Sequence, residues 1–205
     1  MPVELEGGCR VVDLKEGTPL EHGEQRIWQH FQSRLSLRAV EFAGESTFGS
    51  RDQDEVLYDI RENVGIYIPA GTTTTLRGPA TFVSSLTPPA RSHREPIVVR
   101  LNDQPVQKTG DRWYRELIQA EVTQFVGSIP FGRAPDHFHT YEEVICILDG
   151  SGVMHAGASS TPISRGSCIF LPMRQPHCLE NPGRGELRLV GVFYPAGSPA
   201  VRYPA

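Results

Sequence analysis

The chain has 205 residues, of which 39% are hydrophobic and 21% are charged, as is ordinary for a globular protein with a proper core. Its net charge of −4 gathers into no basic stripe, which argues against a nucleic-acid partner and against an anionic membrane surface. No apolar run reaches the length of a membrane span, and the N-terminus lacks the basic start and apolar stretch of a secretory signal, so we expect a cytoplasmic protein.

Short apolar runs bounded by Gly and Pro dominate the chain, which holds 20 Gly and 17 Pro. The segment 19–35 differs because its apolar residues are widely spaced, and we expect a short helix or an exposed segment there. The later runs are about strand length, are rich in Val, Ile, Phe, Tyr or Thr, and lie at 64–71, 123–132, 142–157, 166–172 and 186–197. Regular short strands of this kind predict an all-β sandwich or barrel. The four cysteines form no Cys-x-x-Cys pair and are expected to be free thiols.

The two halves of the chain repeat two sequence patterns in the same order. DEVLYDI at 54–60 resembles EEVICIL at 142–148, and IYIPAGTTT at 66–74 resembles IFLPMRQPH at 169–177. This order suggests a duplicated unit. The spacing differs: Glu55 and Pro69 are 14 positions apart, whereas Glu143 and Pro172 are 29 apart. The first copy therefore lacks 15 residues, enough for a hairpin.

A polar, proline-containing span separates the two copies and is typical of a connection. We therefore divide the chain into an N-terminal half at 1–87, a linker at 88–112 and a C-terminal half at 113–205.

Three histidines and a glutamate in the C-terminal half form the clearest candidate site. His137 and His139 are two apart, so on a strand their side chains face the same way. Glu143 opens the next apolar run and His177 lies 34 residues further on, a separation that a β-barrel can close because its strands aim alternate side chains into one interior. Three imidazoles and one carboxylate suit one divalent Fe, Mn, Ni, Co or Zn ion and leave positions open for a substrate. The alternative is a set of polar rim residues, or of histidines satisfied by hydrogen bonds.

The spacing of nine residues resembles the two signature motifs of the cupin superfamily; these residues are Gly132, His137, His139, Glu143, Gly150, Gly166, Pro172, His177 and Asn181. All four expected ligands fall on metal-ligand positions of the family. The pattern departs from the family where Gly132 stands one residue nearer to its histidine and where Arg174 replaces a common glycine. The resemblance implies an all-β, jelly-roll-like cupin barrel and, together with the repeat, a two-domain cupin (bicupin) whose N-terminal barrel is incomplete.

The N-terminal copy has lost the ligand set. Alignment of the two copies places Gly49, Arg51 and Thr74 at the three histidine positions and leaves only Glu55. A lone carboxylate does not hold a transition metal tightly. We therefore expect the N-terminal half to be a degenerate cupin with a structural role and no metal site. Arg51 either binds an anionic group or is a solvated surface arginine.

Cupin enzymes include dioxygenases, decarboxylases, sugar isomerases, epimerases and lyases, so the resemblance does not choose the reaction. The expected inward residues Ile145 and Ile147 are apolar, which suits a small organic acid, diketone or phenol-like substrate at least as well as a sugar phosphate. We expect a metal-dependent enzyme acting on a small oxygenated organic molecule, with a dioxygenase favoured over an isomerase or lyase of a sugar or keto acid. The alternative from another class is a non-catalytic, metal-containing small-molecule binding protein.

Two more side chains near the site are candidate catalytic residues. Tyr141 either donates a hydrogen bond to the substrate or has a packing or rim role. Arg174 either clamps a carboxylate bidentately or faces solvent from a loop. Cupins often pair through sheet edges or strand exchange, so the resemblance also favours a homodimer.

Overall fold

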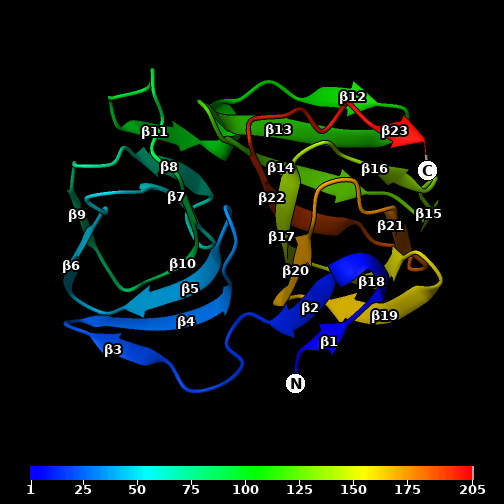
Figure 1. Ribbon diagram of the computed structural model, residues 1–205, viewed down its shortest axis with the longest axis horizontal. Coiled ribbons are helices and arrows are strands. Elements are labelled where there is room, and N and C mark those ends of the chain that lie inside the picture. The colour runs from blue at the N-terminus through cyan, green and yellow to red at the C-terminus, as the bar shows by residue number, and fades with distance from the viewer. Residues whose placement is uncertain (205) are drawn as a thin grey trace.

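Antiparallel strands joined by short turns form almost the whole chain in the computed structural model, which describes residues 1–204. Two short 3₁₀ turns, η1 (Glu6–Gly8) and η2 (Leu101–Asp103), interrupt the strands. The described residues contain no helix long and apolar enough to cross a membrane. Figure 1 shows two rounded halves side by side, with β3 to β11 on the left and β12 to β23 on the right. The all-β prediction is confirmed.

The N-terminal half consists of a seven-stranded sheet and a two-stranded sheet. The large sheet runs in the order β11 (Ile97–Arg100), β8 (Val64–Ile68), β7 (Asp54–Asp59), β10 (Ala80–Thr87), β5 (Leu37–Phe42), β4 (Gln25–Phe31) and β3 (Leu20–His22). The small sheet pairs β6 (Glu45–Phe48) with β9 (Thr74–Arg77).

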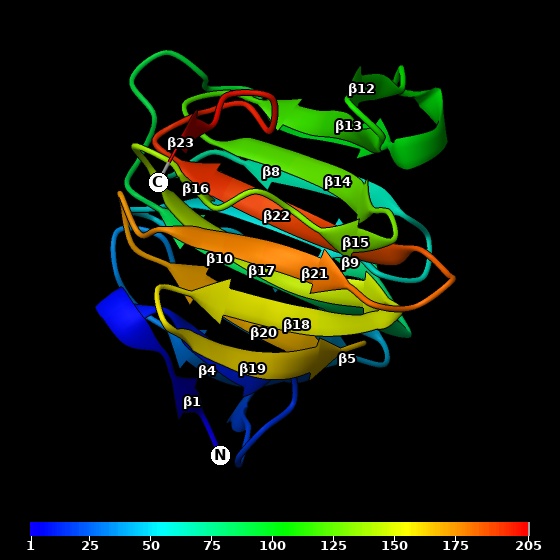
Figure 2. The ribbon, with the colours of Figure 1, turned by 90° about the vertical axis from the view of Figure 1, so that its right-hand side faces the viewer.

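The C-terminal half consists of an eight-stranded and a six-stranded sheet, and Figure 2 shows the second of these from outside. The first runs in the order β1 (Val3–Glu4), β2 (Arg10–Asp13), β20 (Ser167–Leu171), β17 (Glu142–Asp149), β22 (Leu187–Tyr194), β14 (Thr123–Ile129), β13 (Arg112–Gln119) and β12 (Gln107–Thr109). The second runs in the order β19 (Ser159–Ser164), β18 (Ser151–Ala156), β21 (His177–Asn181), β16 (His137–Phe138) and β23 (Tyr203–Pro204), with β15 (Gly132–Arg133) also paired to β21.

The repeated sequence patterns occupy equivalent strand pairs. In the N-terminal half β7 pairs with β8 so that Glu55 lies opposite Ile68. In the C-terminal half β17 pairs with β20 so that Glu143 lies opposite Leu171. Ile68 and Leu171 each precede the proline of the repeat, so the two registers are the same. The hairpin β18–β19, which separates β17 from β20, has no counterpart between β7 and β8. This hairpin is the segment that the shorter spacing of the first copy predicts to be missing.

Strand alternation divides the apolar side chains among three buried clusters. On β17, Val144 and Cys146 belong to a large cluster shared by the seven-stranded and eight-stranded sheets, which holds the two halves together. Ile145 and Ile147, one residue out of phase, belong to the interior of the C-terminal half. On β7, Leu57 likewise belongs to the interior of the N-terminal half. Both strands are therefore buried on both faces, which explains why they read as continuous apolar runs.

The strand pairing crosses the boundaries expected from the sequence. Strands β1 and β2 precede the whole N-terminal half, yet β2 pairs with β20 and extends the C-terminal sheet. Cys9, between them, is fully buried, and burial followed by the nearby Glu143 carboxylate raises the pKa of its thiol to about 12. The expected linker 88–112 supplies β11 to one half and β12 to the other. The division at 1–87, 88–112 and 113–205 stays a prediction, and the sheets draw on strands from either side of its boundaries.

The helix expected as one alternative for residues 19–35 does not form, and much of the segment is exposed, as the other alternative predicts. The segment forms β3 and β4, an antiparallel pair in which Leu20 lies opposite Ile27. Trp28 and Phe31 are both buried although they are three positions apart, because the pairing of β4 with β5 shifts register between Gln29 and Phe31. Such a bulge breaks the twofold alternation that identifies a strand in a sequence.

Candidate metal centre

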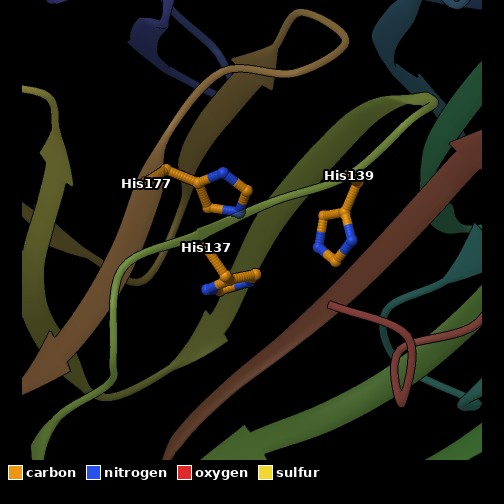
Figure 3. Close-up of side chains that lie close together, drawn as sticks. All are labelled: His137, His139 and His177. Atoms are coloured by element: carbon orange, nitrogen blue, oxygen red, sulfur yellow. The ribbon is translucent and has the colours of Figure 1, made fainter. Parts of the chain in front are cut away.

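Four predicted side chains meet inside the C-terminal half: His137, His139, Glu143 and His177, which we call the metal centre. His137 on β16 lies directly opposite His177 on β21 in the six-stranded sheet. His139 follows β16 immediately, and Glu143 comes from β17 in the facing eight-stranded sheet. Figure 3 shows the three imidazole rings pointing toward one another. The site therefore depends on both sheets and on strands far apart in the sequence.

The side chains of the metal centre lie close together and are buried. One nitrogen from each imidazole lies within 4.8 Å of the others. Oε2 of Glu143 is 3.7 Å from Nε2 of His139 and 3.6 Å from Nε2 of His177. Adjacent donors bound about 2.1 Å from one ion would be about 3.0 to 3.4 Å apart, so the carboxylate has only a few tenths of an ångström to move. The arrangement fits one ion without rebuilding the barrel.

Backbone carbonyls set the orientation of all three rings. Nδ1 of His137 lies 3.0 Å from the carbonyl of Pro135, and Nδ1 of His177 lies 2.8 Å from the carbonyl of Gln175. Nδ1 of His139 lies 3.0 Å from the carbonyl of Val201. A carbonyl only accepts, so each Nδ1 carries the proton and donates it. Each Nε2 is then left with a lone pair, which is the form that binds a metal ion.

Burial makes the metal centre electrically neutral when no ion is bound. Desolvation lowers the pKa of His137 and His139 to about 4 and that of His177 to about 3. It raises the pKa of Glu143 to about 8. The contacts between Glu143 and the imidazoles are consequently not ion pairs at neutral pH. Oε2 of Glu143 is also buried without a hydrogen-bond partner, a costly arrangement that a bound cation would relieve.

A cavity of about 80 Å³ opens beside the metal centre. Because one water needs about 10–15 Å³ of such volume, the cavity can hold several waters or a small organic molecule. Most of its wall is apolar or aromatic, formed by Trp113, Tyr114, Phe125, Ile129, Ile145, Leu179, Leu189 and Phe193. The polar lining beyond the metal centre consists of Thr109, Ser128, Arg112 and Arg202. The prediction that Ile145 faces inward near the site is confirmed.

Neither candidate catalytic residue lines this cavity. Tyr141 is buried and stacks on the ring of His139, and its hydroxyl donates to the carbonyl of Ser198 at 2.9 Å. Burial, assisted by Glu143, raises the pKa of that hydroxyl, so it stays protonated. Arg174 is exposed and has a positive φ of 62°, and its backbone N–H donates to the carbonyl of His139 at 2.7 Å. Both residues support the fold around His139, one by its ring and the other by its backbone.

The C-terminal tail, residues 196–204, contributes to the site in ways that the motif does not reveal. Its carbonyl at Val201 orients His139, and Arg202 lines the cavity. Tyr203 stacks on Phe138, and β23 pairs with β16 next to His137. A carbonyl partner leaves no signal in the sequence, because every residue has one. The unpaired positive charge of Arg202 lies 25 residues beyond the last motif histidine, outside any spacing pattern.

Glycine and asparagine positions of the motif shape turns rather than binding anything. Gly150 joins β17 to β18 with a φ of +84°, a conformation that L residues rarely adopt. A Cβ atom there would also lie 2.5 Å from the carbonyl oxygen of Glu186. The Asn181 side chain is buried and donates to the carbonyls of Ile129 and Gly185 at 2.8 and 2.7 Å. These residues fix the strands that carry the metal centre.

The opposed pKa shifts predict a stability maximum for metal-free protein. The three imidazoles have native pKa values below their ordinary 6.5, so from about pH 4 to 6.5 the unfolded chain binds more protons and stability rises with pH. Glu143 has a native pKa above its ordinary 4.5, so from about pH 4.5 to 8 the native state binds more protons and stability falls. Below about pH 6.5 the three imidazoles outweigh Glu143, and from about pH 7 upward the effect of Glu143 is the larger.

We therefore expect these four groups to make metal-free protein most stable near pH 6.5. Urea midpoints in the presence of a chelator at pH 5, 6.5 and 8 measure this. The decline from pH 6.5 to 8 should be reduced in Glu143→Gln, which cannot ionise. An unchanged decline in that variant would contradict the raised pKa of Glu143.

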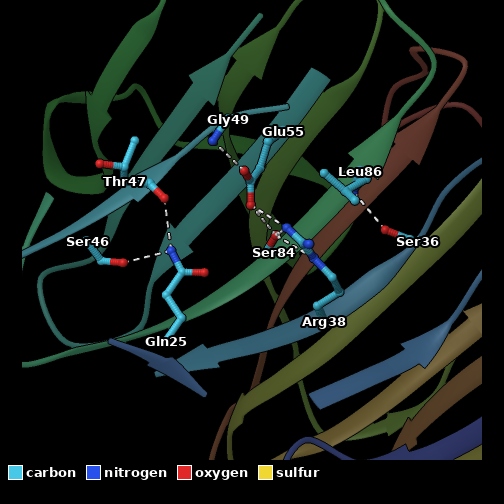
Figure 4. Close-up of polar contacts among 9 residues, drawn as sticks. All are labelled: Gln25, Ser36, Arg38, Ser46, Thr47, Gly49, Glu55, Ser84 and Leu86. Carbon is cyan, nitrogen blue, oxygen red and sulfur yellow. Dashed lines mark hydrogen bonds and ion pairs between the residues drawn. The ribbon is translucent and has the colours of Figure 1, made fainter. Parts of the chain in front are cut away.

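A salt bridge occupies the equivalent position in the N-terminal half. Glu55, the counterpart of Glu143, is buried and accepts hydrogen bonds from Arg38 and from the Ser84 hydroxyl at 2.8 Å. It also accepts from the backbone N–H of Gly49 at 3.0 Å. Figure 4 shows these groups surrounding the carboxylate. Arg51 is exposed, as the solvated alternative predicts, so the positive charge opposite Glu55 comes from Arg38.

Comparisons with known proteins agree with this geometry. A family model of the cupin domain matches residues 127–193, which include all four side chains of the metal centre. An uncharacterized protein of Methanocaldococcus jannaschii is 33% identical over 57 residues, which are 28% of this chain and 46% of that protein. The chain thus matches just under half the length of that curated relative.

Solved structures share the architecture over nearly the whole chain. A Pseudomonas aeruginosa protein described as glyoxylate-induced superposes with a TM-score of 0.78 at 13% identity, covering 97% of this chain and 93% of its own. The E. coli protein YlbA superposes with a TM-score of 0.74 at 11% identity, covering 96% and 95%. An oxalate decarboxylase variant of Bacillus subtilis superposes with a TM-score of 0.74 at 10% identity, covering 92% and 78%. At these identities the likeness shows the fold. The family match identifies residues 127–193 as a cupin domain, and the shared fold extends over nearly the whole chain.

Proposed function

We propose that this protein is a metal-dependent enzyme that acts on a small oxygenated organic molecule bound beside the metal centre. The observation that carries the proposal is the unpaired Oε2 of Glu143, buried 3.6 to 3.7 Å from two imidazole nitrogens whose rings are oriented by backbone carbonyls. His137, His139, Glu143 and His177 would hold one divalent transition metal ion. Such an ion supplies Lewis-acid chemistry or, as iron, oxygen-activating chemistry.

The cavity wall favours some reaction classes over others. Within residues 1–204, its lining holds no carboxylate or imidazole besides those of the metal centre. Isomerases and epimerases move protons between substrate atoms and need such a base. An oxygenase, whose chemistry belongs to the ion, fits this lining better. The structural neighbour named oxalate decarboxylase supports the cleavage of a small organic acid as the second reaction to test.

The cavity residues would bind and enclose the substrate. The aromatic and aliphatic wall excludes water and takes up the apolar part of the molecule. Tyr141 and Arg174 keep the loop of His139 in place from outside the cavity. The volume of about 80 Å³ restricts the substrate to a few non-hydrogen atoms in this conformation.

Elemental analysis and turnover assays test the proposal together. Purified protein should contain about one transition metal ion per chain. Protein loaded with Fe(II) should consume oxygen in the presence of a matching diketone, phenol or keto acid, and CO₂ release from small organic acids would instead identify a decarboxylase. Metal-free protein is the control and should do neither. Protein that binds metal but turns over no member of the panel with any of the five ions would contradict the enzyme proposal and favour a binding protein.

A further inference from the structure

We propose that Arg112 and Arg202 form a carboxylate-binding subsite beside the metal centre, so that the substrate is a small organic acid. This inference rests on the proposed function, because it places the acid relative to that centre. It narrows the substrate class from oxygenated molecules in general to anions with one carboxylate and an apolar remainder.

The two arginines line two adjoining hollows, one of which contains the metal centre. Arg112 begins β13, and Arg202 immediately precedes β23. Both line the cavity of the metal centre, and both also line an outer hollow of about 360 Å³. The outer hollow includes Asp111 and Arg133, but Arg133 is already paired with Asp136 at 3.2 Å. Arg112 and Arg202 therefore lie on the boundary shared by the cavity and the outer hollow, together with Thr109.

No carboxylate of residues 1–204 forms an ion pair with either arginine. Both side chains are partly buried. Burial and then the charge of Arg202 lower the pKa of Arg112, so the two guanidinium groups are close enough to repel each other. The charge of Asp111 opposes this effect on Arg112 but forms no ion pair with it. A ligand carboxylate would offset both positive charges through charge-assisted hydrogen bonds.

The C-terminal tail fixes Arg202 relative to the metal centre. The residue before it, Val201, accepts from His139 through its carbonyl. The residue after it, Tyr203, stacks on Phe138 with ring centroids 5.4 Å apart. Both anchors belong to the segment that carries the first two imidazoles. The backbone of Arg202 is thus fixed relative to the metal centre. Binding of an anion therefore costs little conformational entropy in this segment.

A matched ligand pair tests the subsite. Pyruvate and butane-2,3-dione have the same number of non-hydrogen atoms, but only pyruvate carries a carboxylate. Calorimetric titration of Mn(II)-loaded protein should show pyruvate binding about tenfold more tightly than the dione. Arg112→Met and Arg202→Met should each weaken pyruvate binding about tenfold and leave the dione within about twofold. Arg184→Met is the matched control, because Arg184 is exposed and does not line the cavity, and it should bind both ligands like the parent protein.

Three results would overturn the subsite. They are equal affinity of the parent protein for the two ligands, equal losses for both ligands in the Arg112 and Arg202 variants, or the same loss of pyruvate binding in Arg184→Met. Metal content measured in every variant separates this inference from the proposed function. If the parent protein takes up no metal, the proposed function fails. If the metal-free protein still binds pyruvate more tightly than the dione, and Arg112→Met and Arg202→Met abolish this preference, the subsite stands without the proposed function. If the metal-free protein shows no such preference, the subsite fails as well.

Discussion

His137→Ala is expected to abolish most of the metal content of the purified protein. His137 is one of four side chains that converge on the proposed ion, and its ring lies 4.5 Å, between centroids, from that of His177. Loss of a supporting group around a metal ion already costs about 10- to 100-fold in affinity, so loss of a direct ligand should cost more than about 100-fold. Elemental analysis gives the metal content, and circular dichroism should show an unchanged strand content.

The same loss should appear in thermal stability. An ion present at about 1,000 times its dissociation constant stabilises the parent protein by about 4 kcal/mol, which is about 10 °C for a chain of this length. Added metal should therefore raise the melting temperature of the parent protein and leave that of His137→Ala almost unchanged.

Two further variants control this experiment. His155 lies on β18, and its Nε2 pairs with Glu180 at 2.8 Å away from the metal centre. His155→Ala should therefore keep its metal. Glu143→Gln keeps the shape of the side chain and should fold normally but bind the ion weakly. Full metal content in His137→Ala would mean that the ion is held elsewhere.

Arg38→Met should destabilise the protein more than substitution of any surface arginine. Arg38 supplies the positive charge opposite the buried Glu55 carboxylate, and the variant leaves that charge with only Ser84 and the Gly49 N–H. Removal of one partner of a buried pair costs about 3–5 kcal/mol. For a chain of this length the melting temperature should fall by about 10 °C. Urea denaturation measures the free energy of unfolding directly.

A double variant distinguishes an unpaired charge from lost packing. Arg38→Met combined with Glu55→Gln removes both charges and should recover most of the stability. Arg77→Met is the matched surface control, because Arg77 pairs with Glu45 where both side chains are exposed, and it should change stability by no more than about 0.5 kcal/mol. No recovery in the double variant would show that packing of the Arg38 side chain, rather than its charge, is what matters.

The sequence carried strong signals for some parts of this molecule and none for others. The all-β class was predictable because β17 and β20 are buried on both faces and read as apolar runs with turn residues at their ends. The proximity of His137, His139, Glu143 and His177 was predictable because their spacing follows a barrel motif. The missing hairpin was predictable because the glutamate and the proline of the repeat are 15 positions closer in the first copy than in the second.

Other features of the fold depend on contacts between distant segments, which the local sequence pattern of a strand does not encode. The pairing of β2 with β20 joins residues more than 150 positions apart, and no periodicity in either strand indicates its partner. The bulge in β4 disrupted the alternation that would have identified residues 25–31 as a strand. Arg112 and Arg202 reach the cavity from β13 and from the C-terminal tail, so only the folded chain brings them together.

The strand exchange between the halves has a consequence for the order of assembly. The sheet that carries Glu143 ends in β1 and β2, from the beginning of the described chain, while the carbonyl that orients His139 comes from Val201 near its end. Contacts of such long sequence separation form slowly and late. We therefore expect the metal centre to be complete only after strands from both ends of the described chain have paired, and we expect ion binding late in folding.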